Sequence, residues 1–398
     1  MLVCYVLIGP AAWMLMLAGL LLGRARMGRL RRWRGQLQPD PPHVTILIPA
    51  KDEAEGIGRC IQSVLAQDYP HFDVIAIDDR STDDTGAKLD RYAAQDPRLR
   101  VLHVPRGALP AGWLGKCYAL HLGTQQASGR WLLFVDSDVT LQPQALSAAM
   151  SLTLARDYDA LSILTRLECH SFLERWMLPP LAATWAIMNV VSLTNLDRRR
   201  DVAAANGQFF LIRRSAYETV GGHAAVKDQV TEDVELMRLL KAHGFKTRLF
   251  SGGHLAATRM HSSLGQMFHG WARIYCGTVR RRPGRILGAM LFLLCCVATV
   301  YPALVQAVAG LATSGEPGVL AAASAAHLLL MTLHAGLVYH WAGVGWMHAL
   351  LMPATAPMLF AVLAFTLHKC RTGRITWRGT EVLSPAGKSQ LPSSSQRS

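Results

Sequence analysis

The chain has 398 residues, which allows one large or two ordinary domains in addition to membrane spans. Hydrophobic residues make up 51% of it and charged residues 17%, a mixture that indicates a soluble domain joined to membrane segments. The formal net charge of +14 would suit a nucleic-acid-binding protein, but the arginine runs flank apolar stretches. We therefore expect anionic lipid headgroups as the partner, and no nucleic acid. The eight cysteines form no C-x-x-C pair, which is consistent with free thiols in a reducing compartment.

The chain begins with an apolar stretch, residues 2–23, that is long enough to span a bilayer. It is followed closely by Arg24, Arg26, Arg29, Arg31, Arg32 and Arg34. A cleaved signal peptide carries positive charge before its apolar run and a cleavage site after it, and this stretch has neither. We expect residues 1–23 to be an uncleaved anchor whose arginines place the following residues on the cytoplasmic side. The basic and then proline-rich residues 24–43 are expected to form a linker.

Residues 44–264 are expected to form the soluble domain. Strand patterns occur at residues 44–48, 73–77, 100–104, 131–135 and 208–212, and helical patterns at residues 55–66, 83–95, 116–127 and 231–243. Strands and helices that alternate with short connections are typical of an α/β domain with a doubly wound, mostly parallel sheet.

Two later segments combine apolar residues with features that disfavour a span. Residues 172–196 contain Glu174, Arg175, Pro179 and Pro180, so an interfacial amphipathic segment is favoured over a span. Residues 265–285 mix aromatic residues with arginines, and we expect an interfacial amphipathic helix there.

Residues 286–368 contain about three transmembrane segments, at residues 286–311, 319–339 and 346–367. Residues 369–398 form a basic tail that is expected to be partly disordered. Three crossings would place this tail outside, whereas its basic residues Lys369, Arg371, Arg374 and Arg378 favour the inside. Either the segment that contains Pro353 and Pro357 is re-entrant, or the number of crossings is different.

The apolar run Trp131 to Val135 is followed by Asp136, Ser137 and Asp138. A short continuous apolar run predicts a buried parallel strand, and ligands bind at the carboxyl ends of such strands. No lysine or arginine adjoins the two carboxylates in the sequence, so they repel each other unless a cation lies between them. Mg²⁺ or Mn²⁺ would fit there. The alternative is a solvated turn at an ordinary strand end.

Acidic residues also follow the first two predicted strands, at residues 44–48 and 73–77. The residues at these strand ends are Pro49, Ala50, Glu53, Asp78 and Asp79. Asp79 can accept a hydrogen bond from a base or a ribose hydroxyl. Neither loop has the glycine pattern of a P-loop or a dinucleotide fold, so phosphates would be neutralised by the metal and by Lys116. The alternative for Lys116 is a surface lysine at the start of a helix.

Glu232 and Asp233 open the helix predicted at residues 231–243. Acidic residues in a first turn commonly interact only with the helix dipole. Here apolar, aromatic-rich stretches lie on either side, and a carboxylate in a water-poor cleft can act as a general base on a hydroxyl. Asn206 and Gly207 precede a strand, where they would allow a ligand to approach closely or would form an ordinary turn.

Five motifs follow one another in the order Pro-Ala-Lys-Asp-Glu, Asp-Asp-Arg-Ser, Gly-Trp-Leu-Gly-Lys, Asp-Ser-Asp and Thr-Glu-Asp. With this order and spacing, residues 44–277 resemble a membrane-bound family 2 glycosyltransferase with a GT-A fold. Residues 109–113, 168–175 and 204–207 are most similar to the branch of hopanoid-associated, carotenoid and ceramide glycosyltransferases.

The resemblance implies a nucleotide-sugar donor, with a bias toward a UDP-sugar. It places Asp79 at the nucleoside, Lys116 at the phosphates, Asp136 at the ribose or sugar, and Asp138 on the metal. It makes Asp233 the catalytic base. Many members also have a Gln/Arg-x-x-Arg-Trp motif on an interfacial helix, of which this chain keeps only Trp271 at the expected acceptor interface. That departure favours the transfer of a single sugar over polymer extension.

We therefore expect an inverting, metal-dependent hexosyltransferase that acts on a membrane lipid hydroxyl. It would be a multi-pass protein of the (inner) cell membrane with a cytoplasmic catalytic domain. One alternative is a polyprenyl-phosphate sugar transferase, whose acceptor needs no base, and another is a non-catalytic membrane scaffold. A transporter is disfavoured because the spans lack charged residues at their centres.

Overall fold

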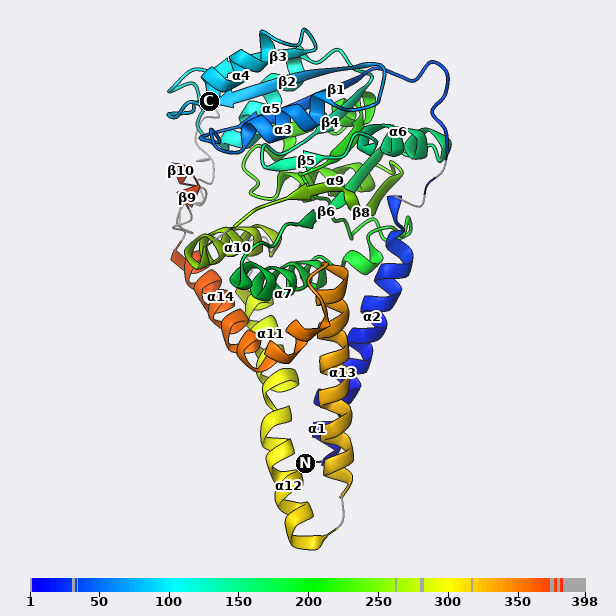
Figure 1. The fold of residues 1–398 in the computed structure, drawn as a ribbon, viewed down its shortest axis with the longest axis vertical. Coiled ribbons are helices and arrows are strands. Elements are labelled where there is room, and N and C mark those ends of the chain that lie inside the picture. Colours follow the sequence, from blue (N-terminus) through cyan, green and yellow to red (C-terminus); the bar gives the residue numbers. More distant parts are fainter. Residues whose placement is uncertain are drawn as a thin grey trace, which may run out of the picture.

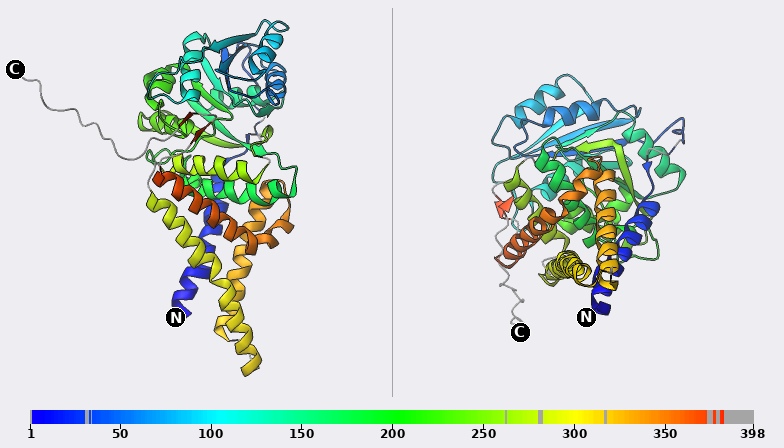
Figure 2. Two further views of the ribbon diagram at one scale, coloured as in Figure 1. Left: turned by 90° about the vertical axis from the view of Figure 1, so that its left-hand side faces the viewer. Right: turned by 60° about the horizontal axis from the view of Figure 1, so that its bottom comes forward.

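The structure is a computed structural model that describes residues 2–30, 33, 35–261, 263–279, 283–315, 318–372, 376–377 and 380–381. Several basic residues of the sequence argument lie outside these ranges, namely Arg31, Arg32, Arg34, Arg280, Arg281, Arg282, Arg374 and Arg378, as does the end of the tail. An α/β domain stands at one end of the molecule, a narrow bundle of long helices at the other, and a layer of helices between them (Figures 1 and 2).

The α/β domain is built on an eight-stranded sheet with the order β3-β2-β1-β4-β7-β6-β8-β5. Its strands are β1 (Val44–Ala50), β2 (Phe72–Asp79), β3 (Leu99–Val104), β4 (Trp131–Phe134), β5 (Val139–Leu141), β6 (Ala160–Leu167), β7 (Phe210–Arg213) and β8 (Thr247–Thr258). Strands β3, β2, β1 and β4 are mutually parallel, as expected. Strand β7 runs antiparallel to both β4 and β6, so the second half of the sheet is mixed.

Helices cover both faces of this sheet because successive residues of its buried strands point to opposite sides. Ile46 and Ile48 of β1 lie in a core with α3 (Ile57–Leu65) and α6 (Ala145–Ala155). Leu47 of the same strand lies in a second core with α5 (Gly115–Gln126) and α9 (Glu232–Ala242). The helices α4 (Thr85–Ala93) and α8 (Arg214–Thr219) complete the domain.

Two helices, α7 (Phe172–Met188) and α10 (Leu264–Thr278), form the layer beneath the sheet (Figure 1). Helix α7 begins with a capping box, in which Ser171 accepts from the backbone of Glu174 and the Glu174 side chain accepts from the backbone of Ser171. The hydroxyl of Tyr275 in α10 donates to the carbonyl of Leu181 in α7 at 2.8 Å. The hydrogen bond from Tyr275 ties the two helices of the layer together.

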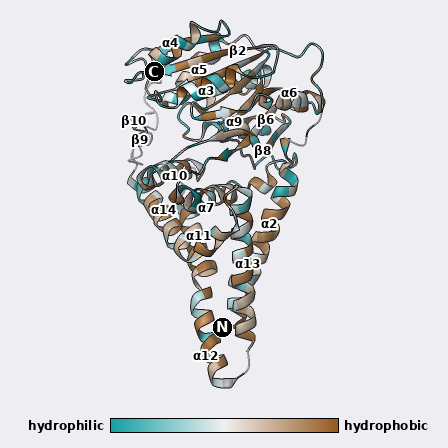
Figure 3. Ribbon diagram, viewed as in Figure 1, coloured by the Kyte–Doolittle hydropathy of each residue, from teal (hydrophilic) through white to brown (hydrophobic). Residues whose placement is uncertain are grey.

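Four helical stretches are long and apolar enough to cross a membrane, by length and composition, and the hydropathy colouring of Figure 3 follows them. The first comprises α1 (Leu2–Val6), η1 (Leu7–Ala11) and α2 (Ala12–Met27). The second comprises α11 (Pro283–Leu293), η5 (Leu294–Ala298) and α12 (Val300–Ser314), and the third is α13 (Val319–Trp341). The fourth comprises η6 (Trp346–Leu351) and α14 (Met352–Thr372).

The N-terminal helix packs against α13 and η5 through polar contacts. The Tyr5 hydroxyl lies 3.1 Å from Nδ1 of His327, whose Nε2 lies 3.0 Å from the carbonyl oxygen of Cys296. The indole N–H of Trp13 donates to the same carbonyl. A Cβ at Gly9 would lie 2.6 Å from His327 Nδ1, so the absence of a side chain at Gly9 permits this approach.

Helix α14 has both of its ends at the layer formed by α7 and α10. Near its start, the Thr355 hydroxyl accepts from the indole of Trp176 in α7 at 2.7 Å. The Trp176 carbonyl accepts from Tyr339 at the end of α13, also at the layer. Near its other end, Cys370 forms a disulfide with Cys276 of α10, with the Cα atoms 6.0 Å apart. Both ends of α14 therefore lie on the same side of the bundle, and its re-entrant path stays a prediction.

That disulfide shows the expectation of free thiols to be wrong for two of the cysteines. Cys276 and Cys370 are 94 residues apart in the sequence, and only the packing of α10 against α14 brings them together. No local spacing pattern could indicate such a pair.

Candidate active site

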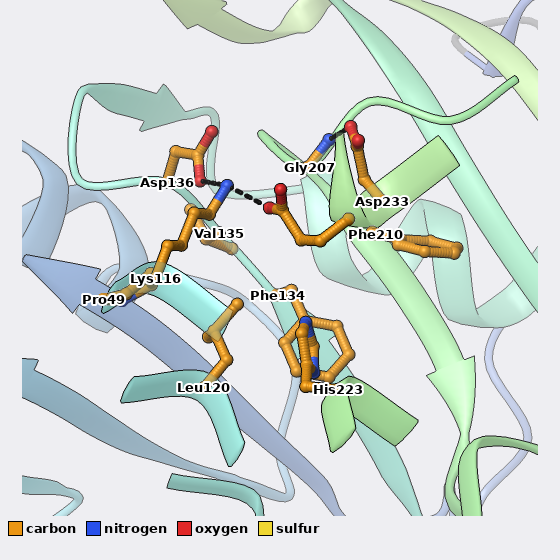
Figure 4. Close-up of a pocket in the computed structure, with 11 residues that line it drawn as sticks. Pro49, Lys116, Leu120, Phe134, Val135, Asp136, Gly207, Phe210, His223 and Asp233 are labelled. Carbon is orange, nitrogen blue, oxygen red and sulfur yellow. Dashed lines mark hydrogen bonds and ion pairs between the residues drawn. The ribbon is translucent and has the colours of Figure 1, made fainter. Parts of the chain in front are cut away.

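The carboxyl ends of β1 and β4 meet the first turns of α5 and α9 at one edge of the sheet (Figure 4). A pocket at this edge is lined by Pro49, Lys116, Leu120, Phe134, Val135, Asp136, Gly207, Phe210, His223, Glu232 and Asp233. Six of these residues had been proposed from the sequence, and the fold brings them together from five separate segments.

Lys116 occupies the centre of this group. Its Nζ lies 2.7 Å from Oδ1 of Asp136 and 2.6 Å from Oε1 of Glu232. Burial alone would lower the pKa of Lys116, but the surrounding carboxylates raise it well above its usual value. The premise that Asp136 has no cation beside it is wrong, because helix α5 supplies one that the local sequence does not show.

Asp233 is held by backbone groups on both of its oxygens. Oδ2 accepts from the N–H of Gly207 at 2.6 Å, and Oδ1 accepts from the N–H of Val234 at 2.8 Å. Burial and the neighbouring Glu232 raise the pKa of Asp233 to about 7, although Lys116 acts in the opposite direction. A Cβ at Gly207 would lie 3.4 Å from Asp233 Oδ2, so Gly207 keeps the space beside the carboxylate open.

Asp138 has a buried carboxylate oxygen, Oδ1, without a hydrogen-bond partner among the described residues. Burial and the charges of Asp136 and Glu53 raise its pKa to about 7, while a hydrogen bond from Thr258 lowers it. An orphaned oxygen beside a second carboxylate fits a hard divalent cation. The described residues contain no cluster of three or more such ligands, so phosphate oxygens and water would supply the other positions.

Asp78 and Asp79 point to opposite faces of β2. Both oxygens of the buried Asp79 accept from the guanidinium of Arg80, at 2.7 and 3.0 Å. Asp78 instead lies 3.0 Å from Nδ1 of His103, whose Nε2 lies 3.0 Å from Asp90. The contacts of Asp78 are thus with the β3 and α4 side of the domain, and its nucleotide-binding role stays a prediction.

Asn206 lies in a polar network next to the carboxylates. Its side-chain amide donates to Gln208 at 3.1 Å, and Gln208 donates to the Thr258 hydroxyl at 3.3 Å. Because Thr258 also bonds Asp138, this network joins β7 and β8 to the proposed metal-binding carboxylates. Gln208 and Thr258 were not proposed from the sequence. The sequence signal that could have indicated Gln208 as a site residue is its position two residues after Asn206.

The remaining proposed residues lie at or beyond the pocket wall. Pro49 lines the pocket, and Ala50 is buried opposite Asp78 in the parallel pairing of β1 with β2. Trp271 is only 4% exposed and packs among α7, α10 and α14 residues, with its ring centroid 5.6 Å from that of Tyr275. It is therefore not among the pocket-lining residues, and its acceptor role stays a prediction.

The floor of the pocket is aromatic, which sequence reasoning missed. Phe134 and Phe210 come from buried strands, where they were expected only as core residues. His223 lies beside them and its Nδ1 is 2.8 Å from the hydroxyl of Tyr217. Burial and the charge of Lys116 lower the pKa of His223 to about 3, so its imidazole is neutral near pH 7. No local pattern around His223 indicates this position.

Residues 45–221 match the family described as Glycosyl transferase family 2. They form a family 2 glycosyltransferase domain. The match covers the strand ends and Lys116 and stops before Glu232 and Asp233.

The glycosyltransferase domain also has relatives among characterised proteins. A 4,4'-diaponeurosporenoate glycosyltransferase of Staphylococcus aureus strain MRSA252 is 27% identical over 264 residues, which cover 65% of this chain and 67% of the relative. The protein of the same name from strain USA300 is 26% identical over the same length. A solved structure of the mannosyltransferase PcManGT from Pyrobaculum calidifontis, in complex with GDP-Man and Mn²⁺, has a TM-score of 0.51 and 17% identity. That alignment covers 92% of this chain and 98% of PcManGT, and it supports the GT-A fold.

Proposed function

We propose that this chain transfers one sugar, with inversion, from a nucleotide-diphosphate sugar to a hydroxyl group of a membrane lipid. Asp233 carries the proposal, because it is a partly buried carboxylate with a pKa near neutral and a fixed orientation beside the donor-side residues. A general base works best when its pKa lies near the working pH. The donor is a UDP-sugar, and the lipid is a hopanoid, carotenoid or sphingolipid-like acceptor. The relatives are named for a carotenoid carboxylate, 4,4'-diaponeurosporenoate, which shares the carotenoid class but not the hydroxyl group proposed here.

The residues act in one displacement. Asp233 accepts the proton of the acceptor hydroxyl, whose oxygen attacks the anomeric carbon from the side opposite to the leaving diphosphate. Lys116 holds Asp136 and Glu232 in place across the cleft. Asp136 and Asp138 would hold a divalent ion, Mg²⁺ or Mn²⁺, which when bound supplies positive charge to the leaving group.

The charge around the pocket favours a neutral acceptor over an anionic one. Asp136, Asp138, Glu232 and Asp233 contribute four carboxylates, and Lys116 is the cation among them. A phosphate or a carboxylate acceptor would approach this group against its negative charge and would not need a base. A hydroxyl is neutral and needs one, so the polyprenyl-phosphate alternative is the weaker one.

The membrane would present the acceptor to the site. We propose that the chain crosses the bilayer three times, in its first three apolar helices, and that η6 and α14 re-enter from the catalytic side. Trp176 binds both the end of α13 and the start of α14, which supports this placement. The described basic residues Arg24, Arg26, Arg285, Lys369 and Arg371 would then lie on the cytoplasmic side with the catalytic domain.

The first experiment is lipid glycosylation by the full chain in nanodiscs made with extracted bacterial lipids, using a panel of labelled UDP- and GDP-sugars. We expect transfer to a lipid hydroxyl that is 10²- to 10⁴-fold slower in Asp233→Asn, since this variant cannot accept the proton. Donor binding should be retained, because the variant keeps the size of the side chain and leaves Lys116, Asp136 and Asp138 in place. Asp228→Asn, at an exposed position in the segment that precedes α9, is the matched control and should keep full activity.

Transfer that survives in Asp233→Asn and runs onto a lipid phosphate or carboxylate would replace this proposal with the anionic-acceptor alternative. Donor binding that is absent in the wild-type chain, with or without Mg²⁺ or Mn²⁺, would support a non-catalytic scaffold.

A further inference from the structure

A second surface of the molecule lies at the membrane boundary, away from the pocket. After α7 the chain forms a loop that packs on helix α2. A Cβ at Gly23 would lie 3.0 Å from Cβ of Ser192, and the side chain of Asn195 donates to the carbonyl of Arg26 at 3.4 Å. Gly23 is the last residue of the N-terminal apolar stretch. The loop is therefore fixed at the level where that helix leaves the bilayer.

The last turn of α7 and the loop after it expose apolar side chains on their outer side. Ile187 is 49% exposed and Val190 is 42% exposed. Val190 also has φ 50° and ψ 45°, a left-handed conformation that is unfavourable for a β-branched residue. A strained backbone that presents an apolar side chain outward indicates that this side chain has a partner outside the protein.

The charged residues that follow Val190 in the chain give this surface an excess of positive charge. Arg199 is paired with Asp201 at 2.8 Å, and Arg248 of β8 is paired with Asp197 at 2.6 Å. These pairs neutralise both acidic residues of the loop. Within the ranges that the structure describes, Arg198, Arg200 and Arg26 are exposed and have no acidic partner. The surface thus combines an apolar tip with three exposed arginines that have no acidic partner among the described residues.

We propose that residues 187–200, together with Arg26, form a docking surface for anionic phospholipid. Ile187 and Val190 enter the boundary between headgroups and acyl chains, and Arg26, Arg198 and Arg200 bind the phosphates. The contact of Ser192 with Gly23 favours a lipid over a protein partner, because it places the loop where the apolar helix meets the headgroups. The surface is distinct from the catalytic pocket and does not depend on the proposed reaction.

The test is photocrosslinking of the full chain in nanodiscs that contain equal amounts of phosphatidylglycerol and phosphatidylcholine. Benzoylphenylalanine replaces Val190, and mass spectrometry measures which lipid it captures. We expect phosphatidylglycerol to be captured in excess by about fivefold or more, since each arginine near the surface contributes about fivefold. The excess should disappear in Arg198→Gln/Arg200→Gln and fall partly in Arg26→Gln.

Two controls separate this result from a general effect of charge or labelling. Benzoylphenylalanine in place of Arg91, which is exposed on α4 at the far end of the molecule, should capture no lipid (Figure 1). Arg91→Gln/Arg130→Gln removes the same charge from exposed positions of the α/β domain and should leave the excess at position 190 unchanged. No lipid captured at position 190, or both lipids captured equally by the wild-type loop, would overturn the proposal.

Discussion

The two halves of the sheet supply the site in different ways. Strands β1, β2 and β4 are parallel, and each places acidic residues at the same edge, at or just after its carboxyl end. The half formed by β7, β6, β8 and β5 is mixed and contributes isolated residues such as Gly207, Gln208 and Thr258. The first half resembles a donor site assembled from successive motifs, whereas the second forms a cleft from segments far apart in the chain. Lys116 connects the two through Asp136 and Glu232.

Replacement of that connecting lysine should have the largest effect. Lys116→Met leaves the buried Glu232 and the partly exposed Asp136 without their cation, and an acidic side chain that loses its partner in this way destabilises the site. We expect kcat/KM to fall more than about 100-fold. Lys116 lowers the pKa of Asp233, so the acid limb of the pH–rate profile should also move above its wild-type position near 7. Lys246→Met, at an exposed ion pair with Asp157, should leave both quantities unchanged.

Removal of the divalent ion should mainly affect the half of the site at the ends of β1, β2 and β4, where the donor is proposed to bind. We expect EDTA and Asp138→Asn each to reduce transfer by about 10²-fold or more, because the leaving diphosphate loses its counter-charge. Added Mn²⁺ should restore the wild-type chain but not the variant. Equal stimulation of both by Mn²⁺ would show that the ion binds elsewhere.

The carboxylate of Asp138 should also make the stability of the fold depend on pH when no metal is bound. The pKa of Asp138 is raised to about 7 when folded, so between about pH 4 and 7 the folded state holds a proton that the unfolded state has lost. Stability should therefore fall as the pH rises through this window. In EDTA, the thermal midpoint of the wild-type chain should decrease more steeply from pH 5 to pH 8 than that of Asp138→Asn, and an equal slope would contradict the burial of this carboxylate.

A smaller effect should come from the nucleoside end of the donor half. A Cβ at Gly115 would lie 2.4 Å from Arg80 Nη2 and 2.7 Å from Asp79 Oδ2, so Gly115→Ala must displace the Asp79–Arg80 pair. We expect the donor KM to rise by about tenfold with little change in kcat, since one binding interaction is lost. Gly265→Ala in α10, where a Cβ meets no atom within 4 Å, is the control. A change in kcat alone would place Asp79 outside the donor site.

The smallest effect should come from His103, which contacts both Asp78 and Asp90 but is half exposed. The Asp78 carboxylate, with that of Asp90, raises the pKa of His103 in the folded state. Its stabilisation is therefore complete below the unfolded pKa and is lost as the pH rises through the higher folded pKa. We expect His103→Asn to reduce the free energy of unfolding by less than about 1 kcal/mol at pH 6 and by nothing at pH 9. Denaturation by urea at the two pH values measures the difference.

The sequence predicted the parallel half of the sheet because its strands are continuous apolar runs bounded by turns. Strands β5, β6 and β8 were not predicted. Strand β8 contains Gly252 and Gly253, and its pairing with β6 shifts register at Leu164 and Thr165, so it lacks a regular alternation. Helix α6 is almost entirely apolar or small and therefore shows no helical periodicity. These elements are specified by their tertiary neighbours.

The candidate site shows the same limit. Its acidic loops followed from strand ends, but the partner of each side chain did not. The ion pair between Lys116 and Glu232 joins residues on different helices, and no spacing indicates it. The separation of Asp78 from Asp79 could have been predicted, because neighbouring residues of a strand point to opposite faces.

The N-terminal helix has a practical consequence for the handling of this protein. Tyr5, Gly9 and Trp13 each contact α13 or η5, so the helix forms part of the bundle and is not a detachable tether. A chain shortened to begin at residue 28 would remove the Tyr5 hydroxyl from Nδ1 of His327 and the Trp13 indole from the carbonyl of Cys296, and would expose both groups to lipid or detergent. Solubilisation by removal of this segment would therefore destabilise the remaining helices, and purification should retain the whole chain.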